Sequence, residues 1–183
     1  MSTANAPSDR RNARPLVSGA VFLAFVLVAS AWVASTFSAE ARVRRATARM
    51  VDLVEKEGEE SPVSLGLSAN RLGKLMATNA VLEAEDYGPL ATGRADIVQV
   101  FAMVRDSLSR IELSDPEIAT ARIRDGEVAA AVEVRYRLVP KAGGAAEGEG
   151  RAELRWNKGQ EGWQVSHALL KVGEGASLPE GWR

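Results

Sequence analysis

The chain contains no cysteine and only one histidine. The absence of cysteine excludes disulfides, thiolate zinc sites, iron–sulfur clusters and a cysteine nucleophile. A single histidine also excludes a two-histidine metal site built from one chain. We therefore expect neither a metal centre nor a bound cofactor.

Neither sign of charge is in excess, since 23 Lys and Arg residues oppose 24 Asp and Glu residues and the formal net charge is −1 at pH 7. This composition argues against a strongly basic nucleic-acid binder, and we expect no nucleic-acid partner. Three sequence motifs are also missing: the P-loop, a G-x-G-x-x-G after a strand, and the G-x-S-x-G elbow. Nucleotide binding and serine-hydrolase chemistry therefore have no support.

One long hydrophobic run is present near the N-terminus. Residues 16–37 are 22 residues without a charge, and as a helix they would rise about 33 Å, enough for a hydrocarbon core of about 30 Å. Two alternatives stay open: a signal peptide cleaved at Ala39-x-Ala41, and a helix of a soluble core. Signal peptides usually have a shorter apolar region of about 7–15 residues. The sequence therefore favours an uncleaved, single-pass anchor in the cell (inner) membrane, with the lipid bilayer as a partner.

The orientation of this anchor depends on the flanking arginines. Their numbers nearly tie, with Arg10, Arg11 and Arg14 before the span and Arg42, Arg44, Arg45 and Arg49 after it. The free amino terminus adds charge on the first side, so we predict a cytoplasmic N-terminus and an extracytoplasmic (periplasmic) globular domain. Residues 1–15 are polar and are predicted to be a disordered tail. Envelope proteins are then the expected protein partners.

Helical periodicity follows the hydrophobic run. Apolar residues recur every three or four positions in 40–57, and Gly58 and Pro62 are predicted to end this helix. Ser68 is predicted to cap a short helix over 69–76, and the clearest helix covers 94–109. The acids Glu57, Glu59 and Glu60 are interpreted as a solvated loop rather than a cation site.

From residue 111 the period becomes two. We predict strands at 80–85, 118–124, 128–138, 152–156 and 163–172, with a turn at 86–89, an Asp125-Gly126 hairpin turn, a flexible loop at 141–150 and a tail at 173–183. Helices followed by a run of strands indicate an α+β fold, with helices on one face of a curved, mainly antiparallel sheet.

The order of these segments resembles the nuclear transport factor 2-like superfamily, including its SnoaL-like branch. The segments that carry the resemblance are VLEAED (81–86), Gly93-Arg94 before the helix ADIVQVFAMV (95–104), the hairpin 121–138, RAELRWNK (151–158) and GWQVSHALLKV (162–172). The resemblance implies a cone-shaped domain over 38–172, with three helices against a bent sheet, a cavity between them, and a homodimer formed through the sheet. Members include enzymes, binding modules and anchored extracytoplasmic domains, so the fold leaves the function open.

His167 is the main candidate for chemistry. Alternation along its strand places it with Trp163, Val165 and Leu169, so we expect it to point into the cone. A carboxylate beside it would make an acid–base pair; the other interpretation is a hydrogen-bonded histidine in the cavity wall. The catalytic candidates are His167, Glu83 and Asp86, and the candidates for ligand binding in the cavity are Tyr87, Arg94, Tyr136, Trp156, Trp163 and His167.

Two functions remain after this reading. We expect a membrane-anchored, non-catalytic domain that binds a protein or a small ligand; the alternative is a lyase, isomerase or hydrolase that uses an acid–base pair in the cone. The surroundings of His167 discriminate between them. A carboxylate contact inside an open polar cavity favours the enzyme, and a filled, apolar environment favours the binding domain.

Overall fold

The computed structural model describes residues 38–173. Within this range the helices are α2 (Ala39–Val54), α3 (Pro62–Leu75) and α4 (Arg94–Ser107), and the strands are β1 (Met76–Ala84), β2 (Gly88–Thr92), β3 (Leu108–Arg124), β4 (Glu127–Pro140), β5 (Ala146–Gly159) and β6 (Gly162–Val172). No helix in this range is long and apolar enough to cross a membrane. The predicted tail (1–15), the predicted anchor (16–37) and residues 174–183 lie outside the described residues.

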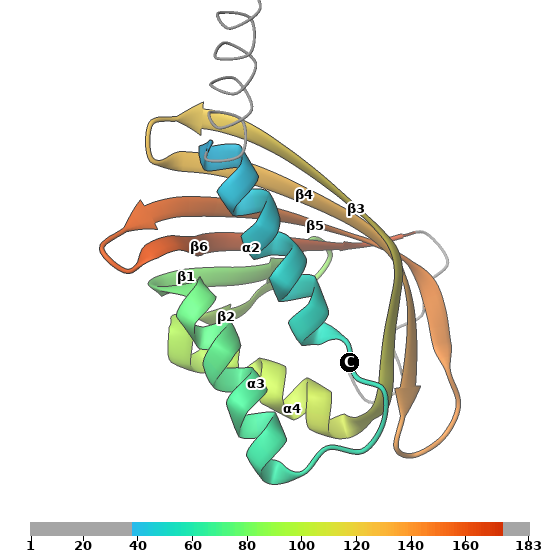
Figure 1. Ribbon diagram of the computed structural model, residues 1–183. Coiled ribbons are helices and arrows are strands. Elements are labelled where there is room, and N and C mark those ends of the chain that lie inside the picture. The colour runs from blue at the N-terminus through green and yellow to red at the C-terminus, as the bar shows by residue number, and fades with distance from the viewer. Residues whose placement is uncertain (1–37, 174–183) are drawn as a thin grey trace, which may run out of the picture. The chain divides into compact units, whose positions relative to one another are not determined.

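The strands form one mixed sheet in the order β2-β1-β6-β5-β4-β3. Neighbouring strands are antiparallel except β1 and β6, which are parallel. The sheet bends strongly, and all three helices lie on its concave side (Figure 1). This arrangement confirms the predicted α+β class with three helices against a curved sheet.

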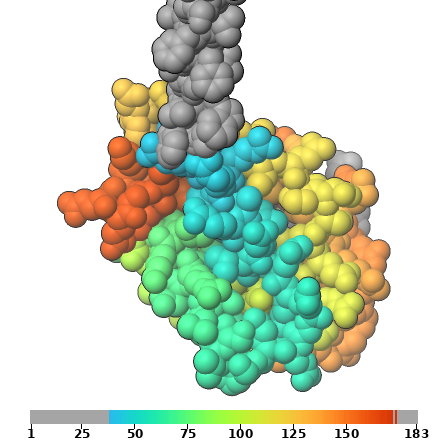
Figure 2. Space-filling model, in the orientation of Figure 1, coloured from blue at the N-terminus to red at the C-terminus, as the bar shows by residue number. Residues whose placement is uncertain are grey.

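The core lies between the helices and the concave face of the sheet. Its central side chain is Trp156, which is 0% exposed. The residues around it come from every layer: Val43 and Ala46 of α2, Leu72 of α3, Ile97 of α4, Val128, Ala130 and Val132 of β4, Leu154 of β5, and Val165 and Ala168 of β6. In the space-filling view, α2 and α3 lie at the front of the molecule, with parts of the strands visible around them (Figure 2).

Helix α3 begins earlier than the sequence predicted. Pro62 is its first residue. Proline is well tolerated there, because the N–H of a first helical position has no intrahelical acceptor. The Ser61 hydroxyl caps the helix by accepting a hydrogen bond from the Ser64 N–H at 3.2 Å. α2 ends at Val54, before Gly58 and Pro62, but Pro62 also opens the next helix. The prediction that Ser68 is a cap is wrong, because Ser68 lies inside α3.

Two segments predicted as turn or loop also carry strands. β2 follows the turn after β1 directly, and β5 begins at Ala146 inside the predicted 141–150 loop. β3 is a single strand of 17 residues, and its pairing with β4 is irregular between Ser114 and Glu117, where Asp115 has a φ of 53°. Pro116 therefore lies at an irregularity within β3, and the predicted strand at 118–124 is the second half of this longer strand.

Candidate functional site

A one-residue bulge decides where His167 points. Trp156 pairs with Val165, whereas the preceding residue, Arg155, pairs with His167, so Ser166 is an extra residue in β6. An extra residue reverses the alternation of side chains beyond it. Val165 is fully buried on the concave face, while His167 lies beside Arg155 on the opposite, outer face. The prediction that His167 shares a face with Val165 and points into the cone is wrong.

On the outer face, His167 meets one of the predicted carboxylates. β1 and β6 run parallel, with Val81 opposite His167 and Glu83 opposite Leu169. The His167 Nε2 and Glu83 Oε2 atoms are 3.2 Å apart, and the two side chains are 34% and 36% exposed. The predicted pair therefore exists, but in an open position rather than inside a cavity.

The remaining predicted residues are dispersed. Asp86 and Tyr87 lie in the exposed β1–β2 turn. Arg94 has a positioning contact: its Nε donates to the Met76 carbonyl at 2.9 Å, and its Nη2 lies 3.3 Å from the Glu161 carboxylate in the β5–β6 turn. Arg94 thus connects the start of α4 to the start of β1 and to the β5–β6 turn.

The predicted aromatic residues belong mainly to the core. Trp156 is fully buried, and Trp163 is half-buried against the same cluster. Tyr136 is half-buried near the far end of β4, and burial raises the pKa of its hydroxyl. The concave face at Trp156 is thus occupied by side chains of the protein itself.

Two buried polar atoms in the helix–sheet layer have no hydrogen-bond partner within the described part of the chain: the Trp156 Nε1 and the Thr47 Oγ1. A buried polar atom without a partner costs about 1–3 kcal/mol. These two atoms are polar positions within an otherwise apolar core.

A hollow of about 470 Å³ lies over the outer face of the sheet, next to His167. We call it the outer-face hollow. Its floor is formed by alanines of β3 and β4, because pairing places Ala119 opposite Ala131 and Ala121 opposite Ala129. Larger side chains of β5 and β6 border it: Glu153, Arg155, His167 and Leu169. The floor of the hollow therefore has small side chains on β3 and β4, while Ile123 of β3 and the larger side chains of β5 and β6 form its border.

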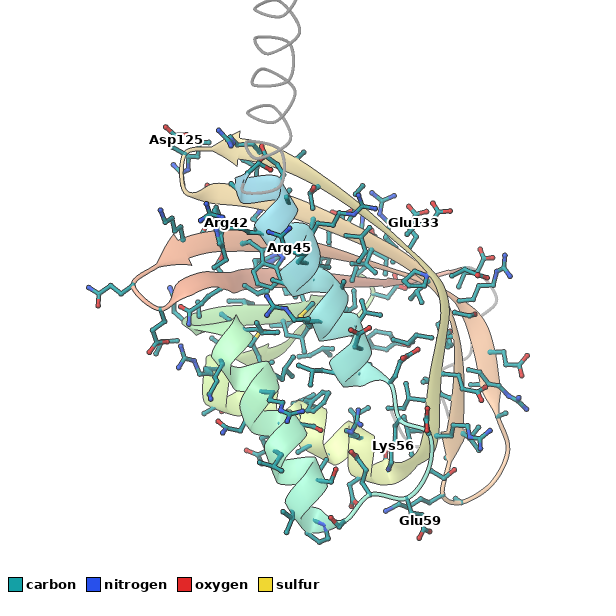
Figure 3. The ribbon with its side chains drawn as sticks, viewed as in Figure 1. Arg42, Arg45, Lys56, Glu59, Asp125 and Glu133 are labelled. Atoms are coloured by element: carbon teal, nitrogen blue, oxygen red, sulfur yellow. The ribbon has the colours of Figure 1, made fainter. Side chains whose placement is uncertain are left out.

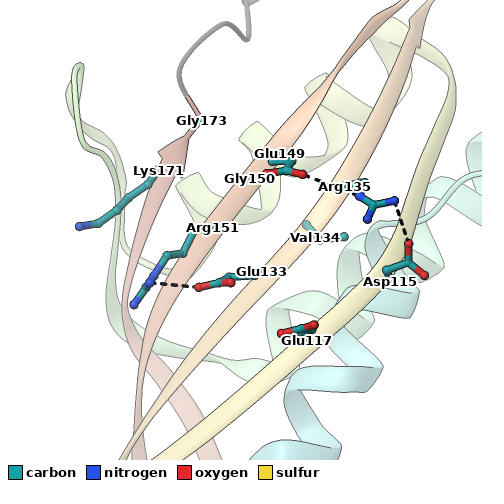
Figure 4. Close-up of a pocket in the computed structure, with 10 residues that line it drawn as sticks. All are labelled: Asp115, Glu117, Glu133, Val134, Arg135, Glu149, Gly150, Arg151, Lys171 and Gly173. Carbon is teal, nitrogen blue, oxygen red and sulfur yellow. Dashed lines mark hydrogen bonds and ion pairs between the residues drawn. The ribbon is translucent and has the colours of Figure 1, made fainter.

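The part of the outer face next to this hollow carries a network of ion pairs. Arg135 lies between Asp115 (3.3 Å) and Glu149 (3.7 Å), and Arg151 bonds Glu133 at 3.0 Å. Figure 4 shows these side chains on the near face of the sheet, with the helices behind it. Such exposed pairs contribute little to stability individually. Their main effect is on the distribution of charge over this surface.

Lys171 extends this charge pattern to β6. Its Nζ lies 3.1 Å from Glu85 and 3.6 Å from Glu153. The hydrogen bond to Glu85, with the charge of Glu153, raises the pKa of the Lys171 ammonium. Lys171 is therefore a cation on the outer face throughout the physiological pH range.

A second polar cluster, which the sequence did not predict, joins the ends of two helices. Arg105 is buried, donates through Nη1 to the Leu53 and Val54 carbonyls (2.7 and 2.9 Å), and forms a two-point pair with Glu60. The Lys56 Nζ donates to the Arg105 and Leu108 carbonyls at 2.8 and 2.6 Å. Glu60 is thus a structural ion-pair partner, and its interpretation as a solvated loop acid is wrong.

The electrostatics of this cluster follow from its burial. The hydrogen bond from Arg105 holds the pKa of the Glu60 carboxyl below its ordinary value. Burial lowers the pKa of Lys56, although the charge of Glu60 opposes this effect. The charged groups of Lys56, Glu60 and Arg105 bind one another or backbone carbonyls. We therefore interpret the cluster as one that stabilises the fold.

Within residues 38–173, no group of three or more His, Cys, Asp or Glu side chains is placed to hold a metal ion. The outer-face hollow itself had a signal in the sequence. Ala119-Thr-Ala121 and Ala129-Ala-Ala131 put small residues at alternate positions of two paired strands, and alternate positions share one face.

Comparison with known proteins bears on the fold. No family model matches the sequence, and no curated protein matches it. A provisionally named scytalone dehydratase from Novosphingobium aromaticivorans DSM 12444 has a TM-score of 0.56 and 16% identity, over 76% of this chain and 93% of that chain. A nuclear transport factor 2-like superfamily protein from Salmonella enterica serovar Typhimurium LT2 has a TM-score of 0.55 and 15% identity, over 79% and 100%.

The protein LinA is also similar, with a TM-score of 0.54 and 10% identity over 64% of this chain and 82% of that chain. The fold of this chain is therefore nuclear transport factor 2-like, as its sequence resemblance implied. Identities this low show the fold alone.

Proposed function

We propose that the chain is a membrane-anchored, extracytoplasmic interaction domain that binds its partner through the outer face of the sheet, without catalysis. The observation that carries this proposal is the reversal at Ser166. The reversed alternation in β6 puts the catalytic candidates His167 and Glu83 on an open face. Trp156 and its neighbours fill the concave side.

Catalysis is the second candidate because the His167–Glu83 contact of 3.2 Å is a recognisable acid–base pair. A lyase, isomerase or hydrolase, however, gains most from such a pair in a site that excludes water, where electrostatic interactions are strong. Both side chains here are about one-third exposed. Solvent at that exposure screens the charges, which favours binding over chemistry.

The first partner that fits the outer face is a second copy of the chain. The floor of the hollow is made of alanines of β3 and β4, with Ile123 of β3 at its border, and larger side chains, including Arg155 and Leu169, lie on β5 and β6. A twofold axis parallel to the strands would place the large half of each copy over the alanine half of the other. Glu117, Glu133, Arg151 and Lys171 lie at one level of β3 to β6, so the same operation would bring Glu117 opposite Lys171 and Glu133 opposite Arg151, which adds charge complementarity.

The dimer is tested by measuring the mass of the full chain in detergent by sedimentation equilibrium. We expect Ala121→Arg, which fills the outer-face hollow, to convert a dimer to a monomer. Ala95→Arg is the matched control, since Ala95 is an exposed alanine of α4 and its replacement should leave the dimer intact. A wild-type chain that is monomeric at every concentration would rule out the dimer.

The proposed anchor rests on the 22 uncharged residues of 16–37. We expect the full chain to stay in the membrane fraction after carbonate extraction, and release of the chain would contradict the anchor. For the orientation, an alkaline phosphatase fused after Arg183 should be active and a cytoplasmic reporter fused there inactive. The reverse pattern would place the domain in the cytoplasm.

The interaction role is tested by affinity purification from solubilised membranes, with wild type, Ala121→Arg and Ala95→Arg compared directly. Because a second copy of the chain and an envelope protein would compete for the outer face, we expect whichever of them wild type and Ala95→Arg retain to be lost with Ala121→Arg. Retention by all three would show that the outer face is not the binding surface.

A further inference from the structure

We propose that one end of the domain, formed by the first turns of α2 and the β3–β4 turn, is a basic surface that binds the anionic headgroups of the bilayer. We call it the basic end. This inference rests on the proposed anchor and adds a second membrane contact to it.

Helix α2 supplies a stripe of arginines. Arg42, Arg45 and Arg49 are exposed and recur at i, i+3 and i+7, which places them on one side of the helix. The opposite side carries Val43 and Ala46, which are buried in the core. The labelled Arg42 and Arg45 lie on the first turns of α2 (Figure 3). The stripe therefore runs away from the start of the helix along its solvent side.

The β3–β4 turn is fastened beside the start of this helix. The Arg122 guanidinium donates to both oxygens of Glu40 at 3.0 and 3.2 Å, and the turn lies next to the first turn of α2 (Figure 1). Arg124 follows at the turn with a side chain that is 78% exposed. The Lys158 N–H donates to the Gly126 carbonyl at 2.8 Å and brings the β5–β6 hairpin alongside.

The acids at this end are held by two of its arginines. Glu40 is bound to Arg122, and Glu127 is bound to Arg124. Asp125 lies 4.0 Å from Arg122. The arginine stripe of α2 and Lys158 add further positive charge. The basic end is therefore net positive although the whole chain has a net charge of −1.

The length of chain between anchor and domain keeps this surface near the bilayer. Only Ser38 separates the predicted span from α2, which begins at Ala39. Even when fully extended, the five residues from Phe37 to Arg42 reach at most about 18 Å, and the headgroup layer extends about 5–8 Å beyond the hydrocarbon core. The chain length therefore keeps Arg42 close to the headgroups, where anionic lipids attract basic side chains.

A contact with anionic headgroups would also explain why several arginines follow the predicted membrane span on its exported side. Arginines on the exported side oppose the usual bias toward basic cytoplasmic flanks. A site for anionic headgroups accounts for a basic cluster there, since the charge is then used on that side of the membrane.

The test uses the full chain in nanodiscs of phosphatidylcholine, with and without phosphatidylglycerol. Because the chain has no cysteine, a single Asp125→Cys change carries a polarity-sensitive dye at the basic end. Ala142→Cys carries the same dye at the opposite end of β4, in the β4–β5 turn, as the control. We expect shielding of the dye at position 125 from acrylamide only in discs with phosphatidylglycerol, and no lipid dependence at position 142.

The charge variants decide the cause. Each basic side chain near an anionic surface changes the docking equilibrium about fivefold, so Arg42→Gln with Arg45→Gln should weaken docking about 30-fold. Arg71→Gln with Lys74→Gln, at two exposed basic residues of α3, should leave it unchanged. Salt at about 1 M should release the wild-type domain, because it shortens the screening length to about 3 Å.

The failure of this inference differs from the failure of the anchor. A chain that co-elutes with the discs but shows the same dye accessibility in both lipids would overturn the headgroup contact alone. A chain that does not co-elute with either disc would overturn the anchor and the contact together. Equal loss of docking in both charge variants would also overturn the assignment to the basic end.

Discussion

Lys56 and Arg105 each place a cation on the carboxyl end of the other's helix. Arg105, in α4, donates to the Leu53 and Val54 carbonyls at the end of α2, and Lys56, just after α2, donates to the Arg105 and Leu108 carbonyls at the end of α4. The last carbonyls of a helix lack intrahelical partners and carry partial negative charge. The two residues thus close two helix ends that meet inside the protein, and Figure 3 labels Lys56 in the segment that follows α2.

Replacing Lys56 should expose the importance of this arrangement. Lys56→Met keeps the length of the side chain but leaves two buried carbonyls without a donor, and we expect a loss of about 2–4 kcal/mol of unfolding free energy. Chemical denaturation of the full chain measures it. Lys74→Met, at an exposed lysine of α3, should change stability by less than about 0.5 kcal/mol. Equal losses in both variants would contradict the proposed role.

Glu60 should make stability depend on acid pH. Arg105 holds the pKa of Glu60 below its ordinary value of 4.5 in the folded protein, so the unfolded chain binds more protons between the two values. The stabilisation is complete above pH 4.5 and is lost as the pH falls through the folded pKa. Glu60→Gln should remove this part of the acid sensitivity, whereas Glu59→Gln, in the same loop, should keep it. An unchanged pH profile in Glu60→Gln would refute the assignment.

The unpartnered Thr47 hydroxyl predicts a stabilising substitution. Thr47→Val keeps the shape of a fully buried side chain and removes an oxygen that has no partner in residues 38–173. We expect a gain of about 0.5–2 kcal/mol, measured by thermal or chemical unfolding. The same change at exposed Thr78 should be neutral within about 0.5 kcal/mol. A loss of stability at Thr47 would mean that its hydroxyl is bonded, for example to a buried water.

His167 should be replaceable at small cost. His167→Gln keeps a polar group opposite Glu83, and a pair that is one-third exposed contributes less than about 1 kcal/mol. The protein should fold with a nearly unchanged melting temperature and retain its cellular function. Complementation measured with His167→Gln decides between the two candidate functions. Because His167 borders the outer-face hollow, a folded variant that still retains the partner in affinity purification but has lost its cellular function would favour the enzyme.

Periodicity predicted the elements whose packing is simple. Ile97 lies on the buried side of the clearest predicted helix, and Val128, Ala130 and Val132 lie on the buried face of β4. Turn-forming residues were less informative. Pro62 is equally suited to follow one helix or to begin another, and the choice depends on the Ser61 cap, which is a contact rather than a pattern.

The site was harder to predict because it depends on pairing between distant strands. The contact of His167 with Glu83 joins residues 84 positions apart, and the sequence named both residues but placed His167 on the wrong face. Simple alternation assumes an unbroken strand, and Ser166 breaks it. Glu60 and Arg105 were missed for the same kind of reason, since nothing local to either residue indicates a partner 45 positions away.

Ser166 has a consequence for how this chain can evolve. Because one extra residue separates the inward Val165 from the outward His167, deletion of one codon at this position would exchange the two faces of the strand beyond it. The imidazole would then enter the interior, and Ala168 would move to the surface. A family in which this position gains or loses a residue can thus pass between an interior polar group and an exterior one without any change of amino-acid type.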